Sequence, residues 1–138
     1  MADPAAPAFA FDRIDRRTKK VTPSLIAAVT NRIVSSLHPR RVILFGSQAH
    51  GQARGGSDID LFICLDDDHP FAHMRRNERA GKVLDLFRYR SFGLDVIVLT
   101  RTEVQDLLNT NEGEWDLVLE ILDQGKSLYE RHGSIRAN

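Results

Sequence analysis

Two aspartates, Asp58 and Asp60, stand two positions apart at the start of an apolar run that extends to Leu65. In a strand, residues at this spacing lie on one face of the sheet, so the two carboxylates repel each other. That arrangement is unfavourable in an apolar setting unless a cation neutralises it. Mg²⁺ suits this role, because it binds one or two carboxylates together with substrate phosphates. The alternative interpretation is an exposed strand start with two solvated acids.

A third aspartate, Asp95, lies near the start of another apolar run, from Leu94 to Leu99. If the two runs form neighbouring strands, Asp95 lies beside the first pair. Three carboxylates around one or two metal ions suit phosphoryl or nucleotidyl transfer, in which metal neutralises the triphosphate and lowers the pKa of the attacking hydroxyl. The third carboxylate then binds a second metal or takes the proton. The alternative is that Asp95 is a turn residue after Gly93.

Gly46 and Ser47 follow a third short apolar run, Arg41 to Phe45. Glycine lets the backbone approach a ligand closely, and the serine can cap a short helix and bond a phosphate. The free N–H groups at such a helix start favour an anion. Taken alone, a Gly-Ser pair after a strand is more often just a simple turn.

The elements that must position these residues follow from hydrophobic periodicity. Three short apolar runs predict buried strands over residues 41–45, 58–65 and 94–99. The strands alternate with helical segments, which predicts an α/β (α+β) fold with a small mixed sheet of about three to four strands flanked by helices.

Helices are expected from Thr22 to His38, within residues 70–90, from Thr102 as an N-cap, and from Trp115 to Gly125. The second helix carries three arginines that predict a solvated face, or else a contact with a partner or nucleotide: Arg75, Arg76 and Arg79. The last helix carries a stripe that predicts core packing, or else a partner-binding surface: Trp115, Val118, Leu119 and Leu122.

Composition sets further limits. The 138 residues predict one domain, and a formal net charge of 0 argues against a generally basic nucleic-acid binder, so no direct nucleic-acid binding is expected. Residues 1–20 are rich in Ala, Pro and charge, which predicts a flexible N-terminal tail, with a basic arm as the alternative. No signal peptide or membrane span is evident, so a cytoplasmic protein is expected. The single cysteine, Cys64, is predicted to be a small buried hydrophobe.

In combination these motifs resemble the minimal nucleotidyltransferases of the DNA polymerase β nucleotidyltransferase superfamily. The resemblance rests on Gly46-Ser47, ten residues, and then Asp58-Ile59-Asp60-Leu61, with Ser57 in front and Asp95-Val-Ile-Val-Leu-Thr100 as the strand of the third acid. It runs from about Thr22 to Tyr129. It implies a polymerase β-type nucleotidyltransferase fold for a domain over residues 21–138.

The resemblance also implies a site. Asp58, Asp60 and Asp95 would be the catalytic triad and the ligands of two Mg²⁺ ions. The nucleoside triphosphate, with ATP as the expected substrate, would be bound by Gly46, Ser47, Arg54 and Ser57. Many relatives carry arginines shortly after the Gly-Ser pair, whereas this chain has Gln48 and His50 there. Because of this departure, binding of the triphosphate by this turn is less well supported than binding of the metal by the aspartates.

Minimal nucleotidyltransferases often act as antitoxins. They pair with a HEPN-type ribonuclease toxin encoded by an adjacent gene, and some transfer AMP from ATP to a tyrosine of that toxin. The resemblance therefore implies an antitoxin-type, Mg-dependent protein adenylyltransferase in a hetero-oligomer with its toxin. One alternative is a non-catalytic antitoxin that acts by direct binding. A small-molecule transferase of the aminoglycoside type is a further alternative, although such relatives usually need an additional helical domain.

Overall fold

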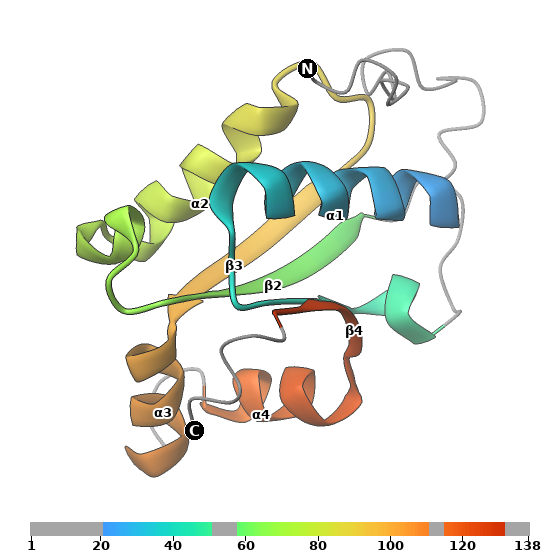
Figure 1. Ribbon diagram of the computed structural model, residues 1–138. Helices are drawn as coiled ribbons and strands as arrows, with labels where there is room; N and C mark the ends of the chain where they lie inside the picture. Colours follow the sequence, from blue (N-terminus) through green and yellow to red (C-terminus); the bar gives the residue numbers. More distant parts are fainter. Residues whose placement is uncertain (1–20, 51–57, 111–114, 132–138) are drawn as a thin grey trace.

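The computed structural model describes residues 21–50, 58–110 and 115–131 of the chain. Within them, four strands form one sheet: β1 (Arg41–Phe45), β2 (Ile59–Leu65), β3 (Leu94–Thr100) and β4 (Lys126–Glu130). The order across the sheet is β3-β2-β1-β4 (Figure 1). β1 is antiparallel to β2 and β4, whereas β2 and β3 are parallel. The mixed four-stranded sheet confirms the predicted fold class.

Helices cover both faces of this sheet. They are α1 (Pro23–Leu37), α2 (Arg76–Leu84), α3 (Arg101–Thr110) and α4 (Trp115–Gln124), with short 3-10 helices η2 (Ser47–His50), η3 (Pro70–His73) and η4 (Asp85–Phe87). α1 and α2 lie on one face, and α3 and α4 lie on the other (Figure 1). No helix in the described ranges is both long and apolar enough to cross a membrane.

α1 begins and ends where the sequence predicts. The Thr22 hydroxyl accepts the Leu25 N–H at 3.1 Å, and His38 ends the helix in the left-handed region at φ 52°. The buried face of the helix includes Val29 and Ile33, both with no exposed surface. Their packing against the sheet fixes α1 over β1 and β2.

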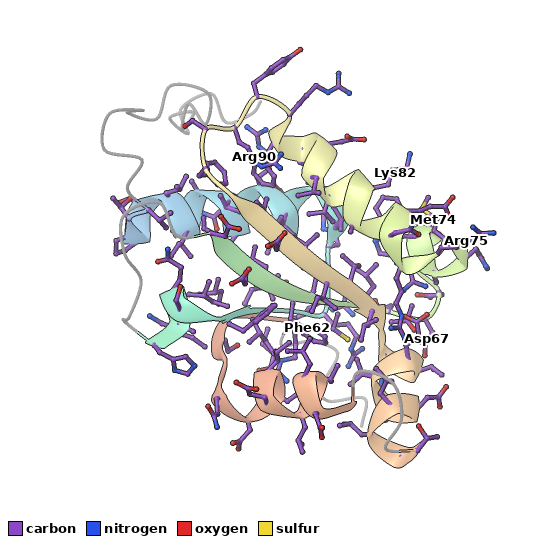
Figure 2. All side chains as sticks on the ribbon, turned by 180° about the vertical axis from the view of Figure 1, so that it is seen from behind. Phe62, Asp67, Met74, Arg75, Lys82 and Arg90 are labelled. Carbon is purple, nitrogen blue, oxygen red and sulfur yellow. The ribbon has the colours of Figure 1, made fainter. Side chains whose placement is uncertain are left out.

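β2 is buried on both faces, as a strand in the middle of a covered sheet must be. Ile59, Leu61 and Ile63 pack toward α1. Phe62 packs on the opposite side, among the side chains between the sheet and α4 (Figure 2). Since Asp60 alternates with the first set, it faces the α3 and α4 side.

Two predictions about the helices of that side are wrong. Thr102 does not cap α3: Thr100 and Glu103 instead exchange two hydrogen bonds, of 3.2 and 2.9 Å, as a capping box. The Thr102 N–H donates to the Asp67 carboxylate at 2.9 Å. In α4, Leu119 is 43% exposed and does not belong to the core stripe.

Arg79 is also placed differently from the prediction of a solvated or partner-facing residue. Its side chain is only 2% exposed, whereas Arg75, the N-cap of the same helix, points into solvent (Figure 2). Its guanidinium binds both Glu103 oxygens, at 2.6 and 3.0 Å. The other N–H groups donate to the carbonyls of Phe71, Ala72 and Val98, so all the donors are satisfied.

Candidate active site

The site is built at one end of the sheet, where β1 leaves it. Gly46 follows β1 with φ 77°, in the left-handed region that favours glycine. A Cβ at this position would lie 3.2 Å from Cγ of Asp60 and closer still to its Oδ2. Ser47 then begins η2, in which the Ala49 N–H donates to the Gly46 carbonyl at 3.1 Å. The predicted turn into a short helix is confirmed, and it lies directly against Asp60.

The three aspartates converge on this end. Asp60 is aligned with Phe45 of β1 and with Asp95 of β3. Asp58 lies two residues before Asp60 and therefore on the same face. The first rung of the parallel β2–β3 ladder fixes this alignment, since the Ile59 N–H donates to the Gly93 carbonyl at 3.0 Å. Asp95 is thus beside Asp60, as the sequence predicts.

Electrostatic repulsion accompanies this arrangement. The pKa of Asp60 is raised, first by partial burial and then by the negative charges of Asp95 and Asp58. Each of these effects disfavours the ionised form. A bound cation would relieve the repulsion, as the sequence predicts for a metal site at these residues.

The donor set fits Mg²⁺ in its chemistry, because all three side chains offer carboxylate oxygens. The described residues nevertheless hold no group of three His, Cys, Asp or Glu side chains already gathered for a metal ion. The carboxylates therefore do not form a finished protein cage. Mg²⁺ commonly completes its six ligands with waters and substrate phosphates, so an incomplete protein set is compatible with this ion.

The remaining predicted residues divide into two groups. Arg54 and Ser57 lie outside the described residues, as does the predicted tail over 1–20. Gln48 and His50 lie in η2, and His50 is exposed. Both positions therefore lie in the short helix that follows Gly46, the residue that lies against Asp60.

Sequence reasoning missed β4, which brings Lys126 into register with Leu44 at the same end of the sheet. Lys126 and Gln48 line a cavity of about 330 Å³ beneath α1. Leu44 in that lining packs toward α1, so the cavity lies on the face opposite Asp60. No signal in the segment around Gly125 marks Lys126 as a neighbour of the site, because only the β1–β4 pairing creates that proximity.

The sequence and the fold of this chain were compared with those of known proteins. No curated protein shows significant similarity to the chain. The fold is similar to that of a protein from Sulfolobus solfataricus assigned as a nucleotidyltransferase, with a TM-score of 0.53 and 20% identity over 93% of this chain and 95% of that one. A chain from the structure of a toxin–antitoxin with AMP-PNP has a TM-score of 0.46 and 19% identity, over 80% of this chain and 78% of that one.

The family model is the more informative match, because it extends over most of the sequence. The model described as Polymerase beta, Nucleotidyltransferase matches residues 29–134, a range that contains Gly46, Ser47 and all three aspartates. This chain belongs to the polymerase beta nucleotidyltransferase family.

Proposed function

We propose that this chain transfers AMP from ATP to a protein hydroxyl in a Mg²⁺-dependent reaction. The alignment of Asp95 with Asp60, on the face that also carries Asp58, is the observation that supports it best. The acceptor oxygen forms a bond to the α-phosphorus, the bond to the β-phosphate oxygen breaks, and pyrophosphate leaves. When bound, Mg²⁺ neutralises the triphosphate and favours the ionised acceptor oxygen.

The residues of the site take separate roles in this proposal. Asp58 and Asp60 hold the metal ions, and Asp95 either binds the second ion or accepts the hydroxyl proton. Gly46, with no side chain, leaves the backbone before η2 open to the phosphates, and Ser47 contributes its hydroxyl. The raised pKa of Asp60 supports a metal role, since partial burial and then the neighbouring carboxylates oppose its charge in the metal-free protein.

For the acceptor, we propose a tyrosine hydroxyl of a HEPN-type ribonuclease toxin encoded by an adjacent gene. The support is the resemblance of the Gly46-Ser47 and Asp58-x-Asp60 pattern to minimal nucleotidyltransferases. In this proposal the chain is a cytoplasmic antitoxin, forms a hetero-oligomer with the toxin, and neutralises it by adenylylation.

A second candidate is an antitoxin that neutralises by contact alone. Gln48 and His50 favour it, because they occupy the turn where relatives have phosphate-binding arginines. The three aspartates favour catalysis, since a cluster of repelling carboxylates without a metal role is unfavourable.

The test is incubation of the purified chain with α-labelled ATP, Mg²⁺ and the product of the adjacent gene. We expect wild type to label that partner, and Asp58→Ala and Asp60→Ala to lower the rate by about 10² to 10³. Asp68→Ala is the matched control, because Asp68 is an exposed acid beyond the far end of β2. It is expected to label the partner at the wild-type rate.

Three results are informative. Label transfer that depends on Asp58 and Asp60 supports the enzyme. Neutralisation that survives both substitutions without any label favours the binding-only antitoxin. Label on neither protein, together with no metal-dependent ATP binding, contradicts the proposed nucleotidyl transfer.

A further inference from the structure

Gly93 stands against the Asp58 carboxylate, at the point where the chain enters β3. A Cβ built on Gly93 would lie 2.5 Å from Cγ of Asp58 and closer still to Oδ1. Real Cβ atoms do not approach other atoms so closely, so a side chain here and the present position of Asp58 exclude each other.

The backbone of Gly93 does not require glycine for its own conformation. Gly46 is the glycine with positive φ among the described residues, and Gly93 is not one of them. An alanine could therefore adopt the Gly93 backbone without strain. The need for glycine at this position comes from the space that Asp58 occupies.

Gly93 is also unable to move away from Asp58. Its carbonyl accepts the Ile59 N–H at 3.0 Å, and Ile59 lies directly between Asp58 and Asp60. The ladder continues with Ile59 aligned with Leu94 and Asp60 with Asp95. The backbone at 93 is thus tied to the backbone that carries both acids of the pair.

We infer that Gly93 is a positioning residue for the metal site: its missing side chain reserves the space that keeps the Asp58 carboxylate beside Asp60. This inference rests on the proposed function, in which Asp58 is a metal ligand. Asp58 is exposed, and its carboxylate is the free end of a flexible side chain. A methyl group at 93 therefore turns the carboxylate into solvent, and the fold survives while the site loses a ligand.

Two other glycines provide matched controls. Gly81 lies in α2 with nothing within 4 Å of an added Cβ. Gly125 lies where an added Cβ would be 2.5 Å from the Ile121 carbonyl oxygen. Because that neighbour is backbone, a substitution there disturbs the fold itself. A substitution at Gly81 should affect neither the site nor the fold, one at Gly93 should affect the site, and one at Gly125 should affect the fold.

The experiment measures binding of Mn²⁺ alone, by the loss of the free-ion signal in electron paramagnetic resonance, together with Tm. Gly93→Ala is expected to weaken Mn²⁺ binding by about 10-fold or more and to keep Tm within about 3 °C of wild type. Gly81→Ala should bind Mn²⁺ as wild type does. Gly125→Ala should lower Tm, and Asp58→Ala should lose Mn²⁺ affinity.

The outcomes separate the inference from the proposed function. Wild-type Mn²⁺ affinity in Gly93→Ala, with affinity lost in Asp58→Ala, overturns the inference and leaves the proposed function standing. Wild-type affinity in Asp58→Ala overturns the proposed metal site.

If Gly93→Ala lowers Tm strongly, the Tm of the double variant Gly93→Ala/Asp58→Ala is compared with that of Asp58→Ala alone. A Tm loss that disappears when the Asp58 carboxylate is absent supports the inference. The same loss in both backgrounds shows that Gly93 serves the fold and overturns it.

Discussion

At the scale of single residues, the charge on Asp60 opposes folding of the metal-free protein. Its pKa is raised by burial and by the carboxylates of Asp95 and Asp58. Between its ordinary pKa and the raised value, the folded state therefore binds more protons than the unfolded state. The free energy of unfolding then falls as pH rises through this window, and the full destabilisation is present above the raised pKa.

Asp60→Asn removes this charge and keeps the shape of the side chain. In EDTA at pH 7 we expect the variant to be more stable than wild type by about 1 kcal/mol, a Tm increase of roughly 3–5 °C for a domain of this size. Mg²⁺ should raise the Tm of wild type more than that of the variant. Thermal unfolding between pH 4 and pH 7 measures both effects.

Asp68→Asn is the control, since it removes an exposed acid away from the site. Its Tm should stay close to that of wild type across the pH range. If Asp60→Asn is no more stable than wild type in EDTA, repulsion at this position is not significant.

The sequence was sufficient to group the three acids but not to place their neighbours. Alternation put Asp58 and Asp60 on one face, and the pairing of two apolar runs put Asp95 beside them. Gly93 entered the prediction only as the residue before an alternative turn at Asp95. Its contact with Asp58 depends on the β2–β3 register, which spacing within a single strand does not specify.

At the scale of elements, Arg79 holds together segments that are distant in sequence. It connects α2, the η3 turn, the edge strand β3 and the start of α3 through Glu103. Burial alone would raise the pKa of Glu103, but the hydrogen bonds from Arg79 and the Thr100 N–H, with the positive charge of Arg79, outweigh it and lower that pKa. The ion pair therefore stabilises β3 and α3 together at neutral pH.

Arg79→Met removes all five donors of the guanidinium: the Glu103 carboxylate keeps the Thr100 N–H but loses both bonds from Arg79, and the carbonyls of Phe71, Ala72 and Val98 each lose one bond. We expect a loss of about 3–5 kcal/mol in the free energy of unfolding, measured by urea denaturation. Arg88→Met is the matched control, because Arg88 is an exposed arginine beyond α2, and its change should stay within about 0.5 kcal/mol. Equal stability of the two variants would refute a structural role for Arg79.

Sequence periodicity could not have shown this burial. Three arginines near one helix are usually solvated, and that expectation fits Arg75, which is exposed. Arg79 departs from it because its carboxylate partner is 24 residues away in α3. β4 was missed for a related reason: its residues are exposed or half-buried and lack apolar alternation, so only pairing with β1 defines the strand.

At the scale of the whole molecule, the sheet separates two apolar layers. One lies under α1 and α2, and the other lies under α3 and α4. The aspartates and the turn at Gly46 lie at one end of the sheet, while Arg79 binds Val98 farther along β3. The residues of the site and the residues that stabilise the fold are thus physically separate. The effects of the variants proposed for the two groups should therefore be independent.

Cys64 offers a direct measurement of how the second layer opens. It lies in β2, is 7% exposed, and packs with Leu99, Val118 and Ile121 on the α3 and α4 side. Burial raises its pKa to about 11, against a smaller lowering effect of Arg40 and Arg41. A reagent can reach the thiol only when the helices separate from the sheet.

We therefore expect alkylation of Cys64 in the native protein at pH 7.5 to be at least about 100-fold slower than in guanidinium, from the thiolate fraction alone. Because reaction then depends on opening of the fold, the rate should follow global stability. Arg79→Met should accelerate labelling, whereas Arg88→Met should not. Mass spectrometry follows the reaction without ambiguity, since the chain has a single cysteine. Rapid labelling of wild type, at a rate that Arg79→Met leaves unchanged, would mean that this layer opens locally and that the ion pair of Arg79 does not control it.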